Sequence, residues 1–144
     1  MQENPKKIKL YTDGGARGNP GPAGIGFVVI EVSSGAEIIL EKCGNYLGHA
    51  TNNQAEYQAL IAGLTWLEEH GRGEPLEIFL DSALVVNQVK GEFKLKNQAL
   101  IPLHAKVMRL LGKRSNYSIH HIPRAQNFLA DSLVNQALDS APHI

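Results

Sequence analysis

The order of strand-like and helix-like segments constrains the fold of this chain more than any other feature of its sequence. Polar and apolar residues alternate over residues 7–12, β-branched residues gather at 25–30, and a third strand pattern covers 37–43 after a short turn. Residues 15–24 are rich in glycine and proline and predict a loop between the first two strands. Three successive strands, of which at least two are joined by a short turn, predict an antiparallel meander.

Helical spacing dominates the rest of the chain. Thr51 and Gln54 have the pattern of a capping box, which predicts a helix from Asn52 to near Gly71. A strand–helix–strand order favours parallel neighbours, so we expect an α/β fold with a mixed sheet and helices on both faces. The remaining expected elements are strands at 76–80 and 117–122 and helices at 82–89, 100–112 and 126–138. The start of the second of these helices is open, because Pro102 belongs in a first turn and not in a helix interior.

The length of 144 residues corresponds to about one ordinary domain, and the sequence contains no repeat or linker. We therefore expect residues 1–144 to form a single domain with its core between about 7 and 138. Cys43 is the only cysteine, which excludes an internal disulfide and favours a reducing compartment. Residues 1–5 lack a secretory signal pattern, and no apolar run approaches a membrane span. These features predict a cytoplasmic protein with no membrane partner, and we expect a monomer because no oligomer interface is apparent in the sequence.

The charge balance restricts how this chain could bind nucleic acid. Lysine plus arginine and aspartate plus glutamate number 14 each, so the formal net charge is zero. Proteins that bind nucleic acid by bulk attraction are usually basic. Any nucleic-acid site here must therefore depend on where individual charges lie.

Four acidic residues stand at informative places in the predicted elements. Asp13 and Asp81 each end a strand, Glu56 lies in the opening turn of the long helix, and Asp131 lies in the last helix. Asn127 falls one turn before Asp131 on the same helical face. Taken singly, these acids have ordinary explanations as a turn starter, a helix cap, a partner of the helix dipole or a solvated helix residue.

The joint placement of these acids favours a metal site. Ligand sites in open α/β sheets lie outside the carboxyl ends of the strands, and neighbouring strands are about 4.8 Å apart. Two carboxylates at about 4 Å repel by roughly 4 kcal/mol at an effective dielectric near 20, so four cannot converge in ionised form without cations. Mg²⁺ and Mn²⁺ prefer oxygen ligands, and a pair of such ions about 3.5–4 Å apart serves phosphodiester displacement.

Four motifs run through the chain in a fixed order. They are Tyr11-Thr12-Asp13-Gly14-Gly15-Ala16-Arg17-Gly18-Asn19-Pro20-Gly21-Pro22-Ala23-Gly24, then Thr51-Asn52-Asn53-Gln54-Ala55-Glu56, then Asp81-Ser82, then His121-Ile122-Pro123-Arg124 followed by Asn127 and Ala130-Asp131. Together they resemble the motifs of type 1 ribonuclease H, and the likeness runs from about Lys7 to Leu138. The compact form most resembles the branch found in archaea and some bacteria.

The resemblance implies a five-stranded sheet of order 3-2-1-4-5 with strand 2 antiparallel. It also implies metal-dependent endonucleolytic cleavage of RNA paired to DNA, which leaves 3′-hydroxyl and 5′-phosphate ends. By position, Asp13, Glu56, Asp81 and Asp131 match the four carboxylates that hold two Mg²⁺ or Mn²⁺ ions. In the family, the residues that match Asp13 and Asp81 serve both ions. Those that match Glu56 and Asp131 each help to hold one.

Substrate contacts are expected from short polar side chains and from backbone amides. Glycine-rich turns let amides approach a sugar-phosphate chain closely. By resemblance, Asn19 and Asn52 line the minor groove of the hybrid, and Thr51 helps to hold a phosphate of the DNA strand. Helix capping remains an equally good explanation for the asparagine pair at the helix start. The candidate substrate-binding residues are Gly14, Gly15, Asn19, Thr51, Asn52 and Asn53.

The chain departs from better-known relatives at two places that bear on binding. Ala83 stands where many relatives carry glutamine, which puts one groove contact in doubt. The stretch between residues 89 and 100 is short and carries only Lys90, Lys94 and Lys96, where relatives carry a basic protrusion. These lysines fit either a reduced phosphate-binding patch or a solvated loop, and we expect modest, salt-sensitive hybrid affinity.

Accessory residues are expected near the last acid. Arg124 could contact a phosphate, because guanidinium pairs bidentately with phosphate. His121 alternates with Ile119 on a strand, so a packed histidine and a functional one are both open. Asn127 completes this accessory set.

Two other functions compete with hybrid cleavage. One is a non-catalytic module that binds hybrids or double-stranded RNA, and the other is a DNA nuclease of related fold. The acids disfavour the first, because pure binding gains nothing from negative charge near phosphates. The expected partner is an RNA–DNA hybrid, with double-stranded RNA as a further candidate.

Overall fold

The computed structural model describes residues 6–141, so the expectation about residues 1–5 lies outside the described residues. The elements in chain order are β1 (Lys7–Ala16), β2 (Gly21–Ser33), β3 (Ala36–Ala50), α1 (Asn52–Glu69), β4 (Leu76–Leu80), α2 (Ala83–Val89), α3 (Ile101–Gly112), β5 (Tyr117–His121), a 3₁₀ turn η1 (Arg124–Asn127) and α4 (Phe128–Asp139). No helix among the described residues is long and apolar enough to span a membrane.

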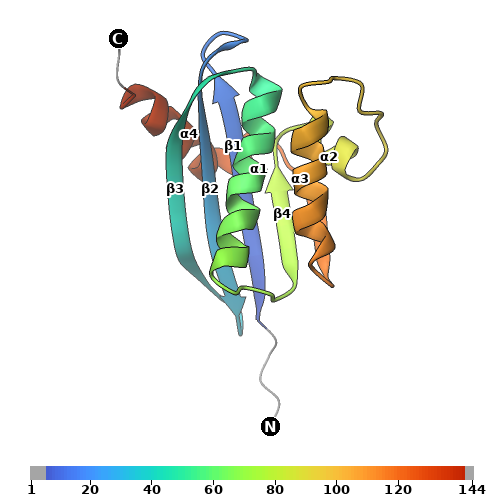
Figure 1. Ribbon diagram of the computed structural model, residues 1–144. Helices are drawn as coiled ribbons and strands as arrows, with labels where there is room; N and C mark the ends of the chain where they lie inside the picture. Colours follow the sequence, from blue (N-terminus) through green and yellow to red (C-terminus); the bar gives the residue numbers. More distant parts are fainter. Residues whose placement is uncertain (1–5, 142–144) are drawn as a thin grey trace.

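The five strands form one mixed sheet in the order β3-β2-β1-β4-β5. β2 runs antiparallel to β1 and β3, whereas β1, β4 and β5 are mutually parallel. Figure 1 shows α1 and α3 in front of the sheet and α4 behind it. The α/β fold class, the strand order, the antiparallel β2 and the helices on both faces are confirmed.

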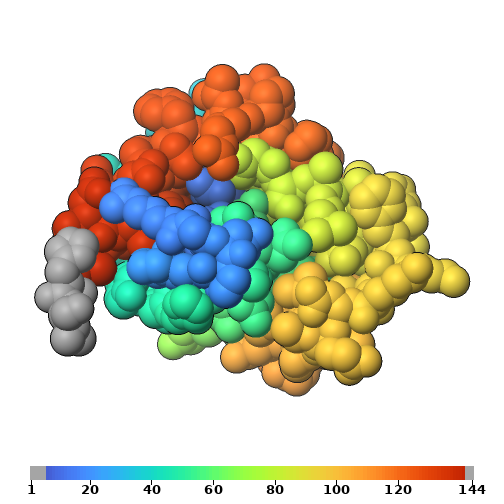
Figure 2. All heavy atoms as spheres, turned by 90° about the horizontal axis from the view of Figure 1, so that it is seen from above, coloured from blue at the N-terminus to red at the C-terminus, as the bar shows by residue number. Residues whose placement is uncertain are grey.

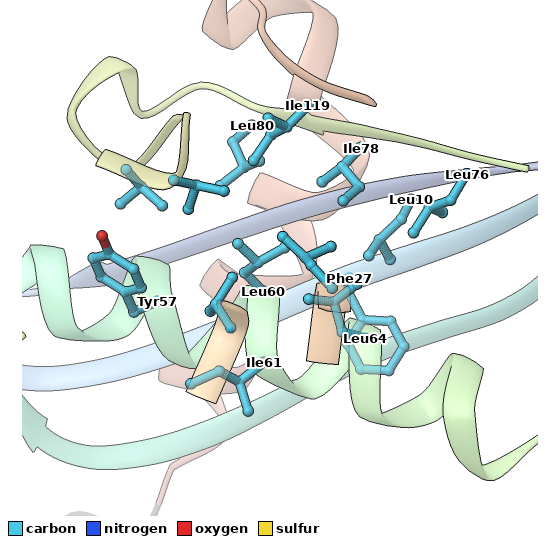
Figure 3. Packing of buried hydrophobic residues seen from close by; sticks show 14 of the residues in the cluster. Leu10, Phe27, Tyr57, Leu60, Ile61, Leu64, Leu76, Ile78, Leu80 and Ile119 are labelled. Atoms are coloured by element: carbon cyan, nitrogen blue, oxygen red, sulfur yellow. The ribbon is translucent and has the colours of Figure 1, made fainter. Parts of the chain in front are cut away.

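The main core lies between the front of the sheet and α1. Alternation along β1 and β4 turns Leu10 and Ile78 to this face, where they meet Leu60 and Leu64 of α1 (Figure 3). The helix approaches closely because Gly63 has no side chain: a Cβ there would lie 2.8 Å from Leu10 Cδ1. This packing fixes the start of α1 beside the carboxyl end of β1.

The first hairpin is longer than the sequence predicted. Residues 15–24 were expected to form a loop, but β1 continues through Ala16 and β2 begins at Gly21. The two strands stay in register from Lys7 opposite Val32 to Ala16 opposite Ala23. Antiparallel pairing supplies hydrogen bonds that outweigh the low strand preference of glycine, so only residues 17–20 connect the strands.

The last helix begins later than the sequence predicted. Gln126 and Asn127 lie in η1, and α4 starts at Phe128 with Asn127 at its N-cap. The expectation that Asn127 lies within the helix one turn before Asp131 is therefore wrong. The Asn127 side chain bonds to β1 and Asp81 instead, which fixes it outside the regular helix.

Candidate active site

Two of the predicted acids lie side by side where the parallel pairing of β1 and β4 ends. The last paired residues are Thr12 and Leu80, and Asp13 and Asp81 follow them directly. Asp13 is 2% exposed, and the Asp81 side chain is 6% exposed. The edge predicted from sequence therefore carries two buried carboxyl groups.

Glu56 joins this pair from α1. It lies just beyond the first turn of the helix, so its expected place in the opening turn is off by about one residue. The helix backbone reaches β1 because Gly14 is a glycine: a Cβ there would lie 2.2 Å from the Ala55 carbonyl oxygen. The Gly14 N–H donates to Glu56 Oε1 at 2.7 Å, which holds the carboxyl group over the strand end.

The structure brings these three acids to one point. Ligand oxygens of Asp13, Glu56 and Asp81 all lie within 4.8 Å of one another. Burial raises the pKa of Asp13, and the neighbouring charges of Glu56 and Asp81 raise it further. Burial and the charge of Asp81 likewise raise the pKa of Glu56. The three carboxyl groups repel one another when ionised, and a divalent cation would relieve that repulsion. Their ligand atoms are all oxygens, which Mg²⁺ and Mn²⁺ prefer, so the residues present fit a divalent metal site.

The fourth acid, Asp131, reaches the site from α4. It is half-buried, and its side-chain hydrogen bond raises the pKa of Asp13, although Asp131 lies outside the group of three within 4.8 Å. The helix sits tightly on the back of the sheet: a Cβ at Gly26 would lie 2.5 Å from the Ala130 carbonyl oxygen, and one at Gly44 would lie 2.6 Å from that of Leu133. Seen from above, the blue, green, yellow-green and red segments that carry the four acids gather on one face (Figure 2).

This clustering predicts how the stability of the metal-free protein depends on pH. Carboxyl groups with raised pKa keep protons in the folded state that the unfolded state releases, so their stabilising contribution is present at low pH. That contribution is lost as pH rises through the folded-state pKa values of Asp13 and Glu56. We expect the melting temperature in chelator to fall by at least about 3 °C between pH 5 and pH 9.

The control for this pH prediction is the same melting series with excess Mg²⁺. Divalent cations held by the ionised carboxylates of the folded state would stabilise it, so the decline should shrink or reverse if the site takes a metal. The pKa of Glu31 is lowered by Arg72, and its effect lies at acidic pH outside this window. A metal-free melting temperature that rises steadily from pH 5 to 9 would contradict the prediction.

Two side chains from the segment after β5 hold the carboxylate of Asp81. Arg124 Nε lies 3.4 Å from Asp81 Oδ2, and the Arg124 side chain is 75% exposed. Asn127 Nδ2 donates to Asp81 Oδ1 at 3.1 Å. The neighbouring charge of Asp81 also raises the pKa of Arg124. Arg124 is thus an exposed cation at the rim of the site, and Asn127 is a buried amide beneath it.

The predicted substrate-binding residues form a connected cluster at the start of α1. The capping box is confirmed: Thr51 Oγ1 accepts from the Gln54 N–H, and Gln54 Oε1 accepts from the Thr51 N–H. Asn19 Oδ1 accepts from the Asn52 N–H at 3.0 Å, and Asn52 Oδ1 accepts from the Ala16 N–H at 2.8 Å. Asn19 therefore ties the 17–20 loop to the start of α1, and Asn52 ties the end of β1 to it, while neither amide nitrogen is used in these bonds.

The other candidates differ in what they can offer a ligand. Asn53 is half-buried in the first turn of α1. The amide of Gly14 is already bonded to Glu56, whereas Gly15 has open space on its side-chain side. His121 is exposed at the end of β5 while Ile119 is buried, so the packed alternative for this histidine is wrong. Lys90, Lys94 and Lys96 are all exposed.

The sequence analysis did not identify the contacts of Gly26 and Asn127 that hold the acids in place. Gly26 interrupts a β-branched run, and an isolated glycine in a strand indicates close approach of another backbone, here that of α4. No comparable local signal marks the contact of Asn127 with Asp81, because it joins residues far apart in the chain.

Known proteins resemble this chain in sequence and in fold. The family described as reverse transcriptase-like matches residues 11–137. The ribonuclease HI of Halobacterium salinarum is 41% identical over 94% of this chain and 66% of its own length. Its crystal structure has a TM-score of 0.87, covering 94% of this chain and 99% of that chain. LC11-RNase H1, whose crystal structure is in complex with an RNA/DNA hybrid, is 43% identical in sequence to this chain. That structure has a TM-score of 0.84, and the match covers 92% of this chain and 96% of that chain.

A bifunctional protein of Mycobacterium tuberculosis is 40% identical over 94% of this chain but only 36% of its own length. This chain thus spans less than two thirds of either curated relative. The family match and the agreement in fold nevertheless extend over almost all of this chain. The chain belongs to the type 1 ribonuclease H family.

Proposed function

We propose that this chain is an endonuclease that hydrolyses the RNA strand of RNA–DNA hybrids with two divalent metal ions, leaving 5′-phosphate and 3′-hydroxyl ends. The observation that carries the proposal is the group of Asp13, Glu56 and Asp81, whose ligand oxygens lie within 4.8 Å of one another. Clustered acids oppose the binding of phosphates unless cations intervene, whereas metal-assisted displacement requires them. The LC11-RNase H1 complex with an RNA/DNA hybrid supports the choice of substrate.

The four acids would together coordinate the Mg²⁺ or Mn²⁺ ions. Asp13, Glu56 and Asp81 would hold the ions from the group within 4.8 Å, and Asp131 would join them through its side-chain contact with Asp13. When bound, the ions supply Lewis-acid stabilisation of the leaving oxygen and a lowered pKa for the attacking water. Arg124 is exposed beside Asp81, so its guanidinium is available to orient a substrate phosphate at the rim.

The start of α1 would hold the hybrid. Within the described residues, the side-chain amide nitrogens of Asn19 and Asn52 make no hydrogen bond, whereas their oxygens tie the loop and the end of β1 to the helix. Two fixed donors without charge suit 2′-hydroxyls and base edges in a minor groove, which carries little sequence information. Thr51 caps the N-terminus of α1, a position that supports contact with a phosphate.

One assay separates the proposed activity from its competitors. End-labelled RNA–DNA hybrid, double-stranded RNA and double-stranded DNA are each incubated with Mg²⁺, Mn²⁺ or chelator. We expect cleavage of the RNA strand of the hybrid with either metal and none in chelator. Cleavage of duplex DNA alone would support a nuclease of another class, and binding without cleavage would support a non-catalytic module. The same proposal includes a cytoplasmic, monomeric enzyme, and the double-stranded RNA arm of the assay tests whether this duplex is a side substrate.

The α2–α3 connection is expected to contribute salt-dependent affinity. Residues 90–97, yellow in Figure 2, project from one side of the face that carries the acids. They combine exposed Lys90, Lys94 and Lys96 with Phe93, which is 49% exposed. Replacing the three lysines with alanine should raise KM for hybrid roughly tenfold, leave kcat nearly unchanged and reduce the salt slope by up to about 3.

The matched control is Lys113→Ala at the far end of α3, where the lysine pairs with Glu68. KM and its salt dependence should stay at the wild-type values in this variant. Initial rates across a series of NaCl concentrations measure both quantities. A triple variant with unchanged KM and salt slope would assign these lysines to a solvated loop.

A further inference from the structure

Asn127 occupies the N-cap position of α4, but its side chain does not cap the helix. Asparagine at a helix N-cap normally accepts a hydrogen bond from a free N–H of the first turn. Asn127 is the N-cap residue of α4, yet its side chain makes no capping bond. The side chain is 1% exposed and turns away from the helix toward β1 and β4 instead.

Both hydrogens of this amide are committed to the metal site. Asn127 Nδ2 donates to the Thr12 carbonyl oxygen at 2.9 Å and to Asp81 Oδ1 at 3.1 Å. A backbone carbonyl and an ionised carboxylate can only accept, so the group that faces them must be the amide nitrogen. One side chain therefore joins the last residue of β1 that pairs with β4, the carboxylate after β4 and the start of the helix that carries Asp131.

The other end of the amide is left unsatisfied. Within the described residues, Asn127 Oδ1 is buried and has no hydrogen-bond partner. A buried unpaired acceptor and an unused capping position both oppose folding. The arrangement is understandable if the Nδ2 end has a task that local stability does not explain.

We propose that Asn127 is a positioning residue that fixes the Asp81 carboxylate for metal binding by tying it to the backbone of β1. The proposal rests on the proposed function, because it assigns a role at the same metal site. Partners that orient a ligating carboxylate raise metal affinity by holding it in place before the metal arrives, and their loss typically costs about 10–100-fold. Asp81 needs such a tie because the sheet pairing of β4 ends at Leu80, one residue earlier.

Asn127→Ser separates positioning from stability. Serine is a good N-cap residue, so it can supply the capping bond that Asn127 withholds, but it is too short to bridge Thr12 and Asp81. We expect the melting temperature in chelator to stay close to that of the wild type. Mn²⁺ affinity, measured by titration calorimetry, should fall about 10–100-fold, and hybrid cleavage should recover toward the wild-type rate at high Mn²⁺.

The matched control is Gln88→Ala. Gln88 is another buried amide, 6% exposed, whose Oε1 accepts from the Tyr57 hydroxyl at 2.6 Å without touching an acid of the site. This variant should lower the melting temperature but keep Mn²⁺ affinity within about twofold of wild type. If Asn127→Ser fails to fold, Asn127→Ala carries the same expectation for Mn²⁺ affinity.

Two results would overturn the proposal. One is a loss of Mn²⁺ affinity below about fivefold in the folded Asn127 variants, and the other is an equal loss in Gln88→Ala. Failure of the proposed function is a different outcome, since the wild-type protein itself would then neither bind Mn²⁺ nor cleave hybrid. A wild type that does both, beside Asn127 variants that bind Mn²⁺ equally well, would refute only the positioning role.

Discussion

Asp81→Asn is expected to lower the rate of hybrid cleavage by roughly 10³-fold or more while leaving hybrid binding intact. Asp81 lies in the buried group with Asp13 and Glu56, and an amide there is a much weaker ligand for a hard cation. Metal-ion catalysis supplies several kcal/mol of charge stabilisation, and each 1.36 kcal/mol corresponds to a tenfold change in rate. Single-turnover cleavage and a binding assay in Ca²⁺ measure the two properties separately.

The same variant carries its own test of folding. Asp81 helps to raise the pKa values of Asp13 and Glu56, so removing its charge relieves repulsion in the metal-free protein. The melting temperature in chelator near pH 8 should therefore rise rather than fall. Loss of activity together with a lower melting temperature would indicate a folding defect. Cleavage at a rate comparable to wild type would remove Asp81 from the metal site.

Gly14→Ala is expected to destabilise the protein by at least about 3 kcal/mol, which corresponds to a loss of roughly 10 °C in melting temperature. A Cβ at this position would lie 2.2 Å from the Ala55 carbonyl oxygen and 2.6 Å from the Glu56 backbone nitrogen. Both contacts are with helix backbone, which cannot rotate away as a side chain can. Either α1 moves off β1 and carries Glu56 with it, or the chain unfolds. Thermal melting in chelator and in Mg²⁺ measures the change.

The adjacent glycine provides the control for stability. A Cβ at Gly15 would meet nothing within 4 Å, although it stands in the same strand and the same motif. Gly15→Ala should change the free energy of unfolding by no more than about 0.5 kcal/mol. Equal melting temperatures for the two alanine variants would show that α1 does not need the close approach at Gly14.

Local patterns predicted a mixed sheet with helices on both faces, and the resemblance to type 1 ribonuclease H added the strand order. Alternation identified the strands, and the β-β-β-α-β order left few ways to arrange them. The neighbourhood of Asp13 and Asp81 followed from the parallel pairing of two strands that each end in an acid. The capping box at Thr51 was likewise readable, because both of its hydrogen bonds lie within four residues.

The rest of the site depends on contacts between distant parts of the chain. The glycines Gly14 and Gly15 indicate the end of a strand, but β1 continues through both because it pairs with β2 as far as Ala16. Glu56 reaches the site only because a helix backbone rests on Gly14. Asn127 was expected inside a helix, and its actual conformation depends on an acceptor at Thr12 and another at Asp81. Local patterns carry no information about such acceptors.

The four acids come from β1, α1, the residue after β4 and α4, so the whole centre requires the chain from Asp13 to Asp131. During synthesis, translation must pass Asp131 and that helix must dock on Gly26 before the set is complete. A chain that is cut anywhere between these elements can regain the centre only by reassociation of its fragments. Cleavage activity would therefore depend on whether the fragments have reassociated. A fold of this kind is suited to a split reporter, in which activity measures that reassociation.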